Sequence, residues 1–173
     1  MRGPRPSVAR ACLLLAGCLL LAACGFHLRG AVSLPAGMTR IHLVGAGPYS
    51  PLGIELHRAL RGAGAAFVPA RQASALLVVM EHHIDRRVLS VDTNGKVREY
   101  ELVGTLSFRV EDLQGKPLVP VQRLMVRRSY LFDPNDVLGK AAEEQNLRQQ
   151  MRRDLVRLAL MRLELAGRHQ PGR

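Results

Sequence analysis

Residues 99–111, Glu-Tyr-Glu-Leu-Val-Gly-Thr-Leu-Ser-Phe-Arg-Val-Glu, decide the fold of this chain. One face of this stretch is apolar and holds Tyr100, Leu102, Leu106, Phe108 and Val110. The other face is polar and holds Glu99, Glu101, Thr105, Ser107, Arg109 and Glu111. Because successive side chains of a strand point to opposite sides, this alternation predicts a strand with one face in the core.

A hairpin connects this strand to the one before it. Asn94-Gly95 is the strongest short hairpin signal, since a type I′ turn requires a positive φ at both central residues. Residues 75–92 predict a long preceding strand, apolar on both faces at its start. Its alternation loses phase near Arg86-Arg87, and we expect a bulge or bend there.

Two further strands complete the expected sheet. Gln114-Gly115 predicts a second turn, after which residues 118–132 alternate again. Pro120 indicates an exposed edge or a bulge near the start of that strand, because proline cannot donate a ladder hydrogen bond. Residues 38–44 alternate too and predict the first strand.

Two helices are predicted from capping residues and from apolar side chains at helical spacing. Ser50 followed by Pro51 begins the first helix, and Gly62 and Gly64 end it. The run 133–136, Asp-Pro-Asn-Asp, ends the sheet and caps a final helix that extends to Ala166. The apolar stripe expected on that helix is Leu147, Met151, Leu155, Leu158, Met161 and Leu165.

The element order is therefore β-α-β-β-β-α, which predicts an α+β fold. We expect a two-layer sandwich in which two helices cover one face of a mostly antiparallel four-stranded sheet. The open face of that sheet would be polar. The expected domain boundaries are a signal peptide over 1–23, a tether over 24–37, the folded domain over 38–166 and a basic tail over 167–173.

The N-terminus has the layout of a bacterial lipoprotein signal. Arg2, Arg5 and Arg10 precede an apolar run that is too short to span a bilayer, and Leu21-Ala22-Ala23-Cys24 is a good lipobox. We expect Cys24 to carry a diacylglycerol and an N-acyl chain, because several acyl chains give stable membrane attachment. The open alternative is an ordinary secretory signal that contains a cysteine.

Removal of residues 1–23 would leave 150 of the 173 residues, enough for one domain with a real core. Three of the 25 Lys and Arg residues precede Cys24, which leaves 22 against 14 Asp and Glu, a formal charge of +8. Cys12 and Cys18 would be lost as well, so no disulfide or cysteine-based metal site is expected. The basic balance favours phosphorylated lipids, lipopolysaccharide or acidic proteins as partners, or else a solvated basic surface.

No pattern in the sequence indicates catalysis, a metal site or a cofactor. His82 and His83 are adjacent on a predicted strand and point to opposite faces, so they cannot share a metal ion. Val44-Gly45-Ala46-Gly47 is similar to a dinucleotide loop, but it lacks the third glycine and a βαβ unit with an acidic residue on its second strand. The low aromatic content, 4%, argues against nucleic-acid binding by base stacking.

Taken in order, three segments resemble the LptE family of lipopolysaccharide-assembly lipoproteins of the Gram-negative outer membrane. The resemblance covers residues 21–165 in order and spacing. It is carried by Cys24-Gly25-Phe26-His27-Leu28-Arg29-Gly30, by Asn94-Gly95-Lys96 with Glu99-Tyr100-Glu101-Leu102, and by Arg128-Ser129-Tyr130-Leu131-Phe132-Asp133 with Lys140 and Glu143-Glu144-Gln145.

This resemblance implies a location and a partner. Members are anchored in the outer membrane, which they reach through the periplasm, and Gly25 after the lipidated cysteine is typical of outer-membrane sorting. They sit inside the large β-barrel LptD, help that barrel to assemble, and form with it the translocon that delivers lipopolysaccharide to the cell surface. No enzymatic activity is implied.

The resemblance also implies binding residues. In the family a lysine early in the last helix takes part in lipopolysaccharide binding, and Lys140 occupies that place. A second basic position lies just before the Asn-Gly turn, where this chain has Thr93 instead. We therefore expect Lys96 and Arg98, just past the turn, to supply this contact. Two other classes remain open, namely an outer-membrane scaffold lipoprotein with no transport role and a periplasmic enzyme.

Overall fold

The computed structural model describes residues 34, 35 and 37–168. The predicted signal peptide, Cys24 and the segment 24–30 of the resemblance lie outside the described residues. Among the residues that it does describe, no helix is both long and apolar enough to cross a membrane.

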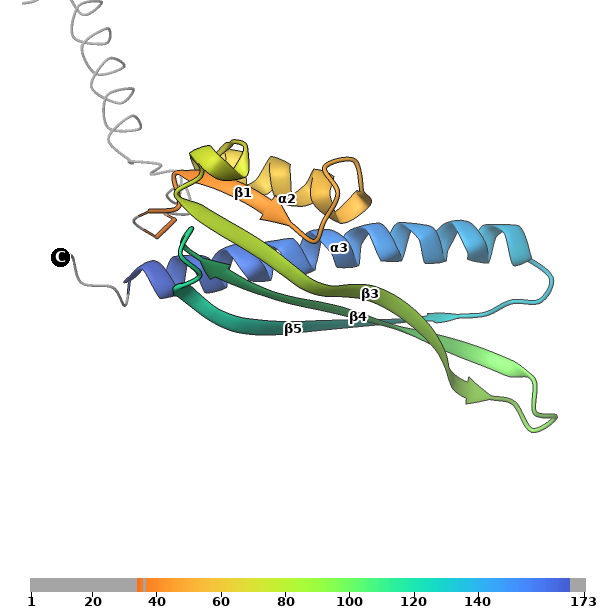
Figure 1. Cartoon of the computed structure of the whole chain (residues 1–173). Coiled ribbons are helices and arrows are strands. Elements are labelled where there is room, and N and C mark those ends of the chain that lie inside the picture. The colour runs from red at the N-terminus through yellow and green to blue at the C-terminus, as the bar shows by residue number, and fades with distance from the viewer. Residues whose placement is uncertain (1–33, 36, 169–173) are drawn as a thin grey trace, which may run out of the picture. The chain divides into compact units, whose positions relative to one another are not determined.

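Five strands, two α-helices and one short 3-10 helix make up the described chain (Figure 1). They are β1 (Arg40–Val44), α2 (Pro51–Gly62), β2 (Ala66–Phe67), the 3-10 helix η1 (Ala70–Gln72), β3 (Ala75–Val91), β4 (Val97–Glu111), β5 (Pro117–Leu131) and α3 (Val137–Arg168). Both predicted caps are confirmed. The Ser50 side chain accepts a hydrogen bond from the Gly53 amide at 3.0 Å, and the Asp136 side chain accepts one from the Gly139 amide at 3.0 Å.

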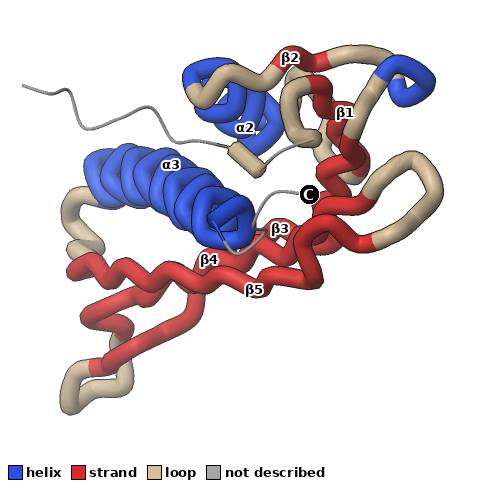
Figure 2. Tube along the Cα trace, turned by 90° about the vertical axis from the view of Figure 1, so that its left-hand side faces the viewer, coloured by secondary structure: helices blue, strands red, loops and turns tan. Residues whose placement is uncertain are grey.

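The α+β fold class is confirmed, with one sheet that is larger than expected. Its strand order is β2-β1-β3-β4-β5, and both helices lie on the same side of it (Figure 2). The long pairs β3–β4 and β4–β5 are antiparallel, whereas β1 pairs in parallel with both β2 and β3. The sheet is therefore mixed and five-stranded. The extra strand β2 has only two residues, too few to show a periodic pattern.

The parallel pairing of β1 and β3 corrects one expectation, because β1, α2 and β3 form a βαβ unit. The glycines of its first loop are explained by packing within the protein. A Cβ atom on Gly45 would lie 2.0 Å from the carbonyl oxygen of Val79, and one on Gly53 would lie 2.0 Å from that of Gly47. The loop Gly45–Gly47 thus packs against the chain's own backbone. This packing explains its glycines without a bound dinucleotide.

The expected irregularities in the sheet are only partly confirmed. Pro120 does lie in an edge strand, β5, and opposite a register shift between Phe108 and Val110 of β4. The bulge or bend expected near Arg86-Arg87 lies just after them: both residues pair regularly with β4, and the register shifts between Val88 and Val91. A second shift, which was not predicted, falls at Met80, which shows half of its surface.

Helix α3 buries a different stripe in its second half from the one predicted. Met151 and Leu155 are fully buried as expected, but Met161 and Leu165 are about half exposed. The buried positions continue instead as Val156, Ala159 and Leu163. Steps of four residues from Leu155 keep these side chains over the sheet, because 3.6 residues make one helical turn.

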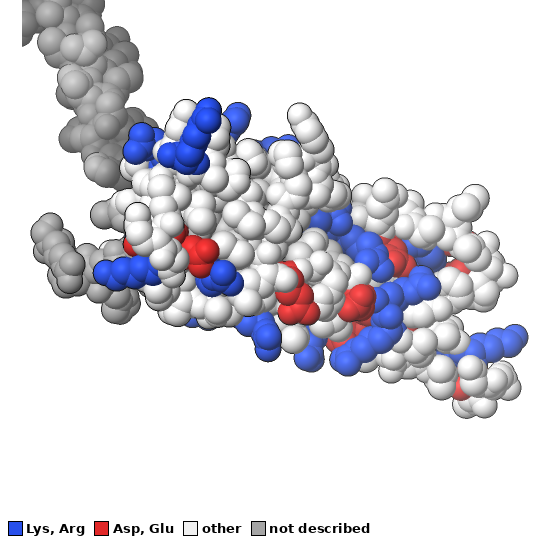
Figure 3. All heavy atoms as spheres, viewed as in Figure 1, with Lys and Arg blue, Asp and Glu red and all other residues white. Residues whose placement is uncertain are grey.

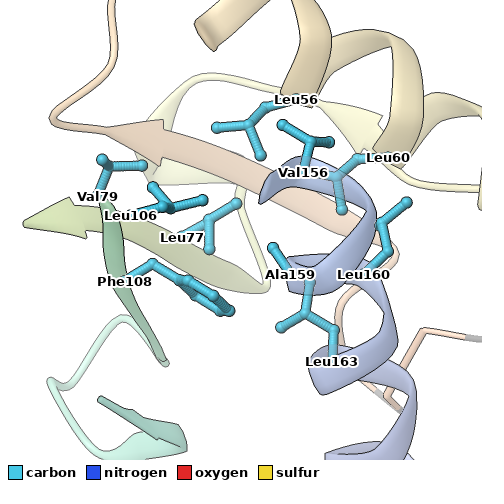
Figure 4. A pocket seen from close by; sticks show the side chains of 10 residues that line it. All are labelled: Leu56, Leu60, Leu77, Val79, Leu106, Phe108, Val156, Ala159, Leu160 and Leu163. Carbon is cyan, nitrogen blue, oxygen red and sulfur yellow. The ribbon is translucent and has the colours of Figure 1, made fainter. Parts of the chain in front are cut away.

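The core lies between the sheet and the two helices, around a small apolar cavity. That cavity has a volume of about 10 Å³, enough for about one water molecule. Figure 4 shows its lining, which comes from α2, α3, β3 and β4 and is entirely apolar: Leu56, Leu60, Leu77, Val79, Leu106, Phe108, Val156, Ala159, Leu160 and Leu163. A second, smaller cluster of buried side chains lies nearer the start of α3 and consists of Leu102, Tyr130 and Met151.

Candidate functional site

The free end of the β3–β4 hairpin is held in shape by one carboxylate. The Asp92 side chain accepts hydrogen bonds from the amides of Asn94 and Lys96 at 2.8 and 2.9 Å. Gly95 has a φ of +75°, which glycine adopts without strain, but the φ of Asn94 is not positive, so the hairpin turn is in the expected place without being the type I′ turn that the Asn-Gly pair predicted. The turn therefore gives Lys96 a fixed backbone position at the start of the strand that carries Arg98.

The link between β5 and α3 places the start of α3 near the β3–β4 hairpin. The Phe132 amide donates to the Arg98 carbonyl oxygen at 2.9 Å, which joins this link to β4. Asp136 then caps α3, and a Cβ atom on Gly139 would lie 2.2 Å from one of its carboxylate oxygens. A side chain at this position would displace the Asp136 carboxylate from its capping position, and the capped first turn presents Lys140 next to the hairpin.

Lys96, Arg98 and Lys140, the three residues predicted to bind lipopolysaccharide, line one pocket of about 420 Å³. We call it the hairpin-end pocket, and Figure 1 shows that the tip of the β3–β4 hairpin and the start of α3 lie toward the same end of the domain. Its remaining lining residues are Asp92, Val97, Leu131, Phe132, Asp133 and Pro134. Thr93 does not line it. Three cationic and two acidic side chains give the lining a net positive charge.

The three cations of this pocket differ in their surroundings. Lys96 and Arg98 are exposed. The Lys140 ammonium is 24% exposed and lies 2.9 Å from the Glu143 carboxylate, and this hydrogen bond raises the pKa of Lys140 above its ordinary value. Lysine and arginine side chains donate charge-assisted hydrogen bonds, so the pocket can hold phosphate or carboxylate groups.

Apolar side chains are exposed around the same pocket. They are Val88, Leu89, Val91, Leu131, Val137 and Leu138, which lie near the ends of β3 and β5 and at the start of α3, and Leu138 shows 87% of its surface. Exposed apolar side chains beside charged groups are a feature of interaction sites. The chemistry of this end suits a ligand that has both anionic groups and hydrocarbon.

A polar cluster behind the pocket was not predicted from the sequence. Glu144 of α3 accepts hydrogen bonds from the hydroxyl of Tyr130 at 2.5 Å, from Arg148 at 2.8 Å and from Arg86 at 2.9 Å. The Arg86 guanidinium also lies over the Tyr100 ring, 4.5 Å from its centroid. These contacts, which we call the Glu144 cluster, hold α3 against all three long strands.

The charges of the Glu144 cluster are set by these contacts. Burial by itself raises the pKa of the Glu144 carboxyl, but the hydrogen bonds that it accepts outweigh burial, so its pKa lies below the ordinary value. Burial and the bond to Glu144 raise the pKa of the Tyr130 hydroxyl. Glu144 is therefore ionised and Tyr130 neutral across the physiological range. One sign of this arrangement is present in the sequence. Arg148 follows Glu144 by four residues, which places the two side chains on the same face of a helix.

The open face of the sheet is polar, as expected, and carries ion pairs. Arg87 pairs with Glu101 at 2.5 Å, and Arg109 pairs with Glu111 at 2.7 Å. His83 lies 3.3 Å from both Glu81 and Asp85 on its own strand. Figure 3 shows acidic and basic side chains close together over the lower part of this view.

Comparison with solved structures places the chain in a class of bacterial lipoproteins that share this α+β domain. It is 30% identical to lipoprotein B of Nitrosomonas europaea, with a TM-score of 0.69 over 86% of this chain and 99% of that one. The minor lipoprotein of Acinetobacter baumannii has the same fold, with a TM-score of 0.63 over 74% of this chain and 92% of that one at 24% identity.

The sequence comparisons identify the family within this class. The family model described as "LptE: Lipopolysaccharide-assembly" matches residues 38–163. The chain is 32% identical to the LPS-assembly lipoprotein LptE of Pectobacterium atrosepticum, over 84% of this chain and 79% of the relative. It is 29% identical to that of Photorhabdus laumondii, with the same coverage. The chain belongs to the LptE family of lipopolysaccharide-assembly lipoproteins.

Proposed function

We propose that this chain is an outer-membrane lipoprotein, anchored through Cys24, that works with an LptD-type β-barrel to deliver lipopolysaccharide to the cell surface. In this proposal the domain occupies and helps to assemble the barrel, and the hairpin-end pocket binds lipopolysaccharide directly. The family membership supports the general role in lipopolysaccharide assembly.

The observation that carries the proposal is the convergence of three cations on one pocket. Lys96 and Arg98 come from the β3–β4 hairpin, and Lys140 comes from a helix more than 40 positions later in the sequence. Lipid A has phosphate groups in its headgroup and hydrocarbon in its acyl chains. The pocket offers cations beside exposed apolar side chains such as Leu131 and Leu138.

The open face of the sheet supports the partnership with a barrel. Its ion pairs, Arg87–Glu101 and Arg109–Glu111, keep charged side chains on a surface that no helix covers. The interior of a large outer-membrane barrel is polar, so such a face can lie against it without burying unpaired charge. A scaffold lipoprotein with no transport role would have no need for the hairpin-end pocket, and this favours transport.

Binding of purified lipopolysaccharide to the detergent-solubilised protein tests the pocket. We expect the Lys96→Ala/Arg98→Ala and Lys140→Ala variants each to bind at least about tenfold more weakly, since charged hydrogen bonds contribute about 1.5–3 kcal/mol. Lys116→Ala is the matched control. Lys116 ends the β4–β5 turn, where Asp112 accepts from its amide at 2.8 Å just as Asp92 does from that of Lys96.

The outcome separates a site from general attraction between charges. Loss in the pocket variants with unchanged binding in Lys116→Ala supports the hairpin-end pocket. Equal binding by all four proteins, or equal loss in all three variants, would exclude it as the lipopolysaccharide site.

A further inference from the structure

The chain enters the described domain at the end opposite the hairpin-end pocket. Pro35 is buried next to Gly167 of α3, where a Cβ atom would lie 3.0 Å from the Cα of Pro35. The Ser74 hydroxyl donates to the carbonyl oxygen of Gly37 at 2.5 Å, which fixes the entering chain beside the start of β3. The entry point is therefore held against the domain by contacts from two elements.

Three arginines surround this entry point. Arg40 begins β1, and its carbonyl oxygen accepts from the Ser74 amide at 2.8 Å. Arg71 lies in η1, three residues before Ser74. Arg61 lies in the last turn of α2, from which the chain runs directly to Ala66, the residue paired with Arg40. We call Arg40, Arg61 and Arg71 the entry-end arginines.

The charge of these arginines is not balanced locally. Residues 37–80 contain four arginines and a single acidic residue, Glu55, which pairs with the fourth arginine, Arg58, at 3.1 Å. All three entry-end arginines are exposed, and within the part of the chain that the structure describes none of them has an ion-pair partner. Figure 3 shows Lys and Arg side chains, with no acidic one among them, at the upper left over the end of α2.

The length of the preceding chain relates this surface to the membrane. Leu34 is ten residues after Cys24, and ten residues span at most about 35 Å when fully extended. The inference rests on the proposed function at this one point, because it takes Cys24 as the lipid attachment site. A lipid on Cys24 would hold the entry end within reach of the headgroups of the same leaflet, while the hairpin-end pocket lies at the far end of the 17-residue strand β3.

We propose that Arg40, Arg61 and Arg71 form a docking surface for the anionic phospholipid headgroups of the membrane that carries the anchor. Guanidinium groups bind phosphate through paired hydrogen bonds and lose little hydration in doing so. Attraction to an anionic surface acts over about 10 Å, so it operates only at the end of the domain beside the membrane. Docking there orients the domain, with the hairpin-end pocket at the end far from these headgroups.

Co-sedimentation with vesicles tests this surface without the anchor. The protein is residues 24–173 with Cys24→Ser, which contains all of the described residues and therefore both clusters of buried side chains. We expect it to bind vesicles of phosphatidylcholine mixed with phosphatidylglycerol, to bind pure phosphatidylcholine vesicles much more weakly, and to dissociate as salt is raised.

Charge-matched variants locate the surface. Arg61→Gln/Arg71→Gln should weaken binding about 25-fold, since each arginine near an anionic bilayer contributes about fivefold. Arg123→Gln/Arg127→Gln removes the same charge from β5 and should change binding less than about twofold. Equal loss in the two pairs, no binding to phosphatidylglycerol, or binding only when lipopolysaccharide is added to the vesicles would each overturn the proposal.

Labelling with radioactive palmitate in cells tests lipid attachment at Cys24 independently of headgroup binding by the entry-end arginines. Full-length chain should incorporate the label, and Cys24→Ala should not. If the full-length chain fails to incorporate label while the vesicle results hold, the anchoring part of the proposed function is wrong and the headgroup surface stands. Normal labelling with no vesicle binding overturns the surface alone.

Discussion

Glu144 joins three elements through one carboxylate. Its side chain is 14% exposed and accepts hydrogen bonds from Tyr130 of β5, Arg86 of β3 and Arg148 of α3 itself. Arg148 in turn donates to the carbonyl oxygen of Ile84 at 2.5 Å, which ties the helix to the backbone of β3. Because these donors are partly shielded from water, loss of the acceptor leaves polar groups without partners.

Glu144→Gln should lower the free energy of unfolding by about 1–3 kcal/mol, because it removes the charge that three donors share. Urea unfolding followed by circular dichroism measures the change. Glu143→Gln is the control, because Glu143 is 45% exposed and, among the described residues, forms an ion pair only with Lys140, and a loss below about 0.5 kcal/mol is expected for it. Equal losses in the two variants would contradict the role of the Glu144 cluster.

Two partly buried histidines, His57 and His82, make stability depend on pH. Desolvation, and then the charges of Arg152 and His83, lower the pKa of His82, whose Nε2 atom is buried without a hydrogen-bond partner. Desolvation and Arg61 lower the pKa of His57. Both shifts mean that the unfolded chain binds protons more readily than the folded one below the ordinary pKa of about 6.5. Stability is therefore full above that pH and falls as the pH is lowered through it.

Thermal or urea unfolding at pH 7.5 and 5.5 measures this effect. We expect the wild-type protein to lose stability between these two values, and His57→Gln/His82→Gln to lose less, since glutamine does not titrate. His83 is left in place in both proteins. The same loss in the variant and in the wild type would show that other groups control the pH dependence.

At the scale of elements, α3 contributes most of the helical face of the core. Its buried side chains in the second half are Leu155, Val156, Ala159 and Leu163, while Leu158 and Met161 turn toward β5 and line a groove there with Arg128 and Arg157. The groove contains the ion pair of Arg128 with Asp154 at 2.9 Å. The helix therefore packs with one stripe and leaves an adjacent apolar stripe at the side of the sheet.

Leu155→Ala should lower the free energy of unfolding by about 2–5 kcal/mol, because Leu155 is fully buried and its truncation leaves a cavity. Met161→Ala in the same helix should cost less than about 1 kcal/mol, because Met161 is 48% exposed. Chemical denaturation of the two variants gives the comparison. A larger loss for Met161→Ala would instead support the stripe predicted from the sequence.

Sequence patterns predicted the elements well where the signal is local. The alternation in β4, the position of the Asn94-Gly95 turn and the Asp136 cap depend on neighbouring residues, and all three are confirmed. The direction of β1, the strand β2 and the bulge at Met80 depend on pairing between distant segments. No local pattern encodes such pairing, and for that reason these features were missed or misplaced.

At the scale of the whole domain, burial decreases toward the hairpin end. The main cluster lies between α2, the second half of α3 and the sheet, and a smaller cluster around Leu102 and Met151 follows. No residue between Ile84 and Leu102 is buried. Binding segments are commonly drawn from such regions of low local stability, because they must adjust to a ligand.

The candidate site was predictable only in part. The resemblance singled out Lys96, Arg98 and Lys140, and the structure brings these three residues together around one pocket. The Glu144 cluster could not be predicted, because Arg86 and Glu144 are 58 residues apart in sequence and meet only through the docking of α3. Cys24 lies outside the described residues and stays a prediction.

Mild detergent extraction of outer membranes, followed by capture of the full-length tagged chain, tests the central claim most directly. The account predicts that a large β-barrel protein co-purifies in a similar molar amount, and that it still does so with Lys96→Ala/Arg98→Ala, whose substitutions lie at the hairpin end. Recovery of intact, membrane-bound chain without any barrel would contradict it.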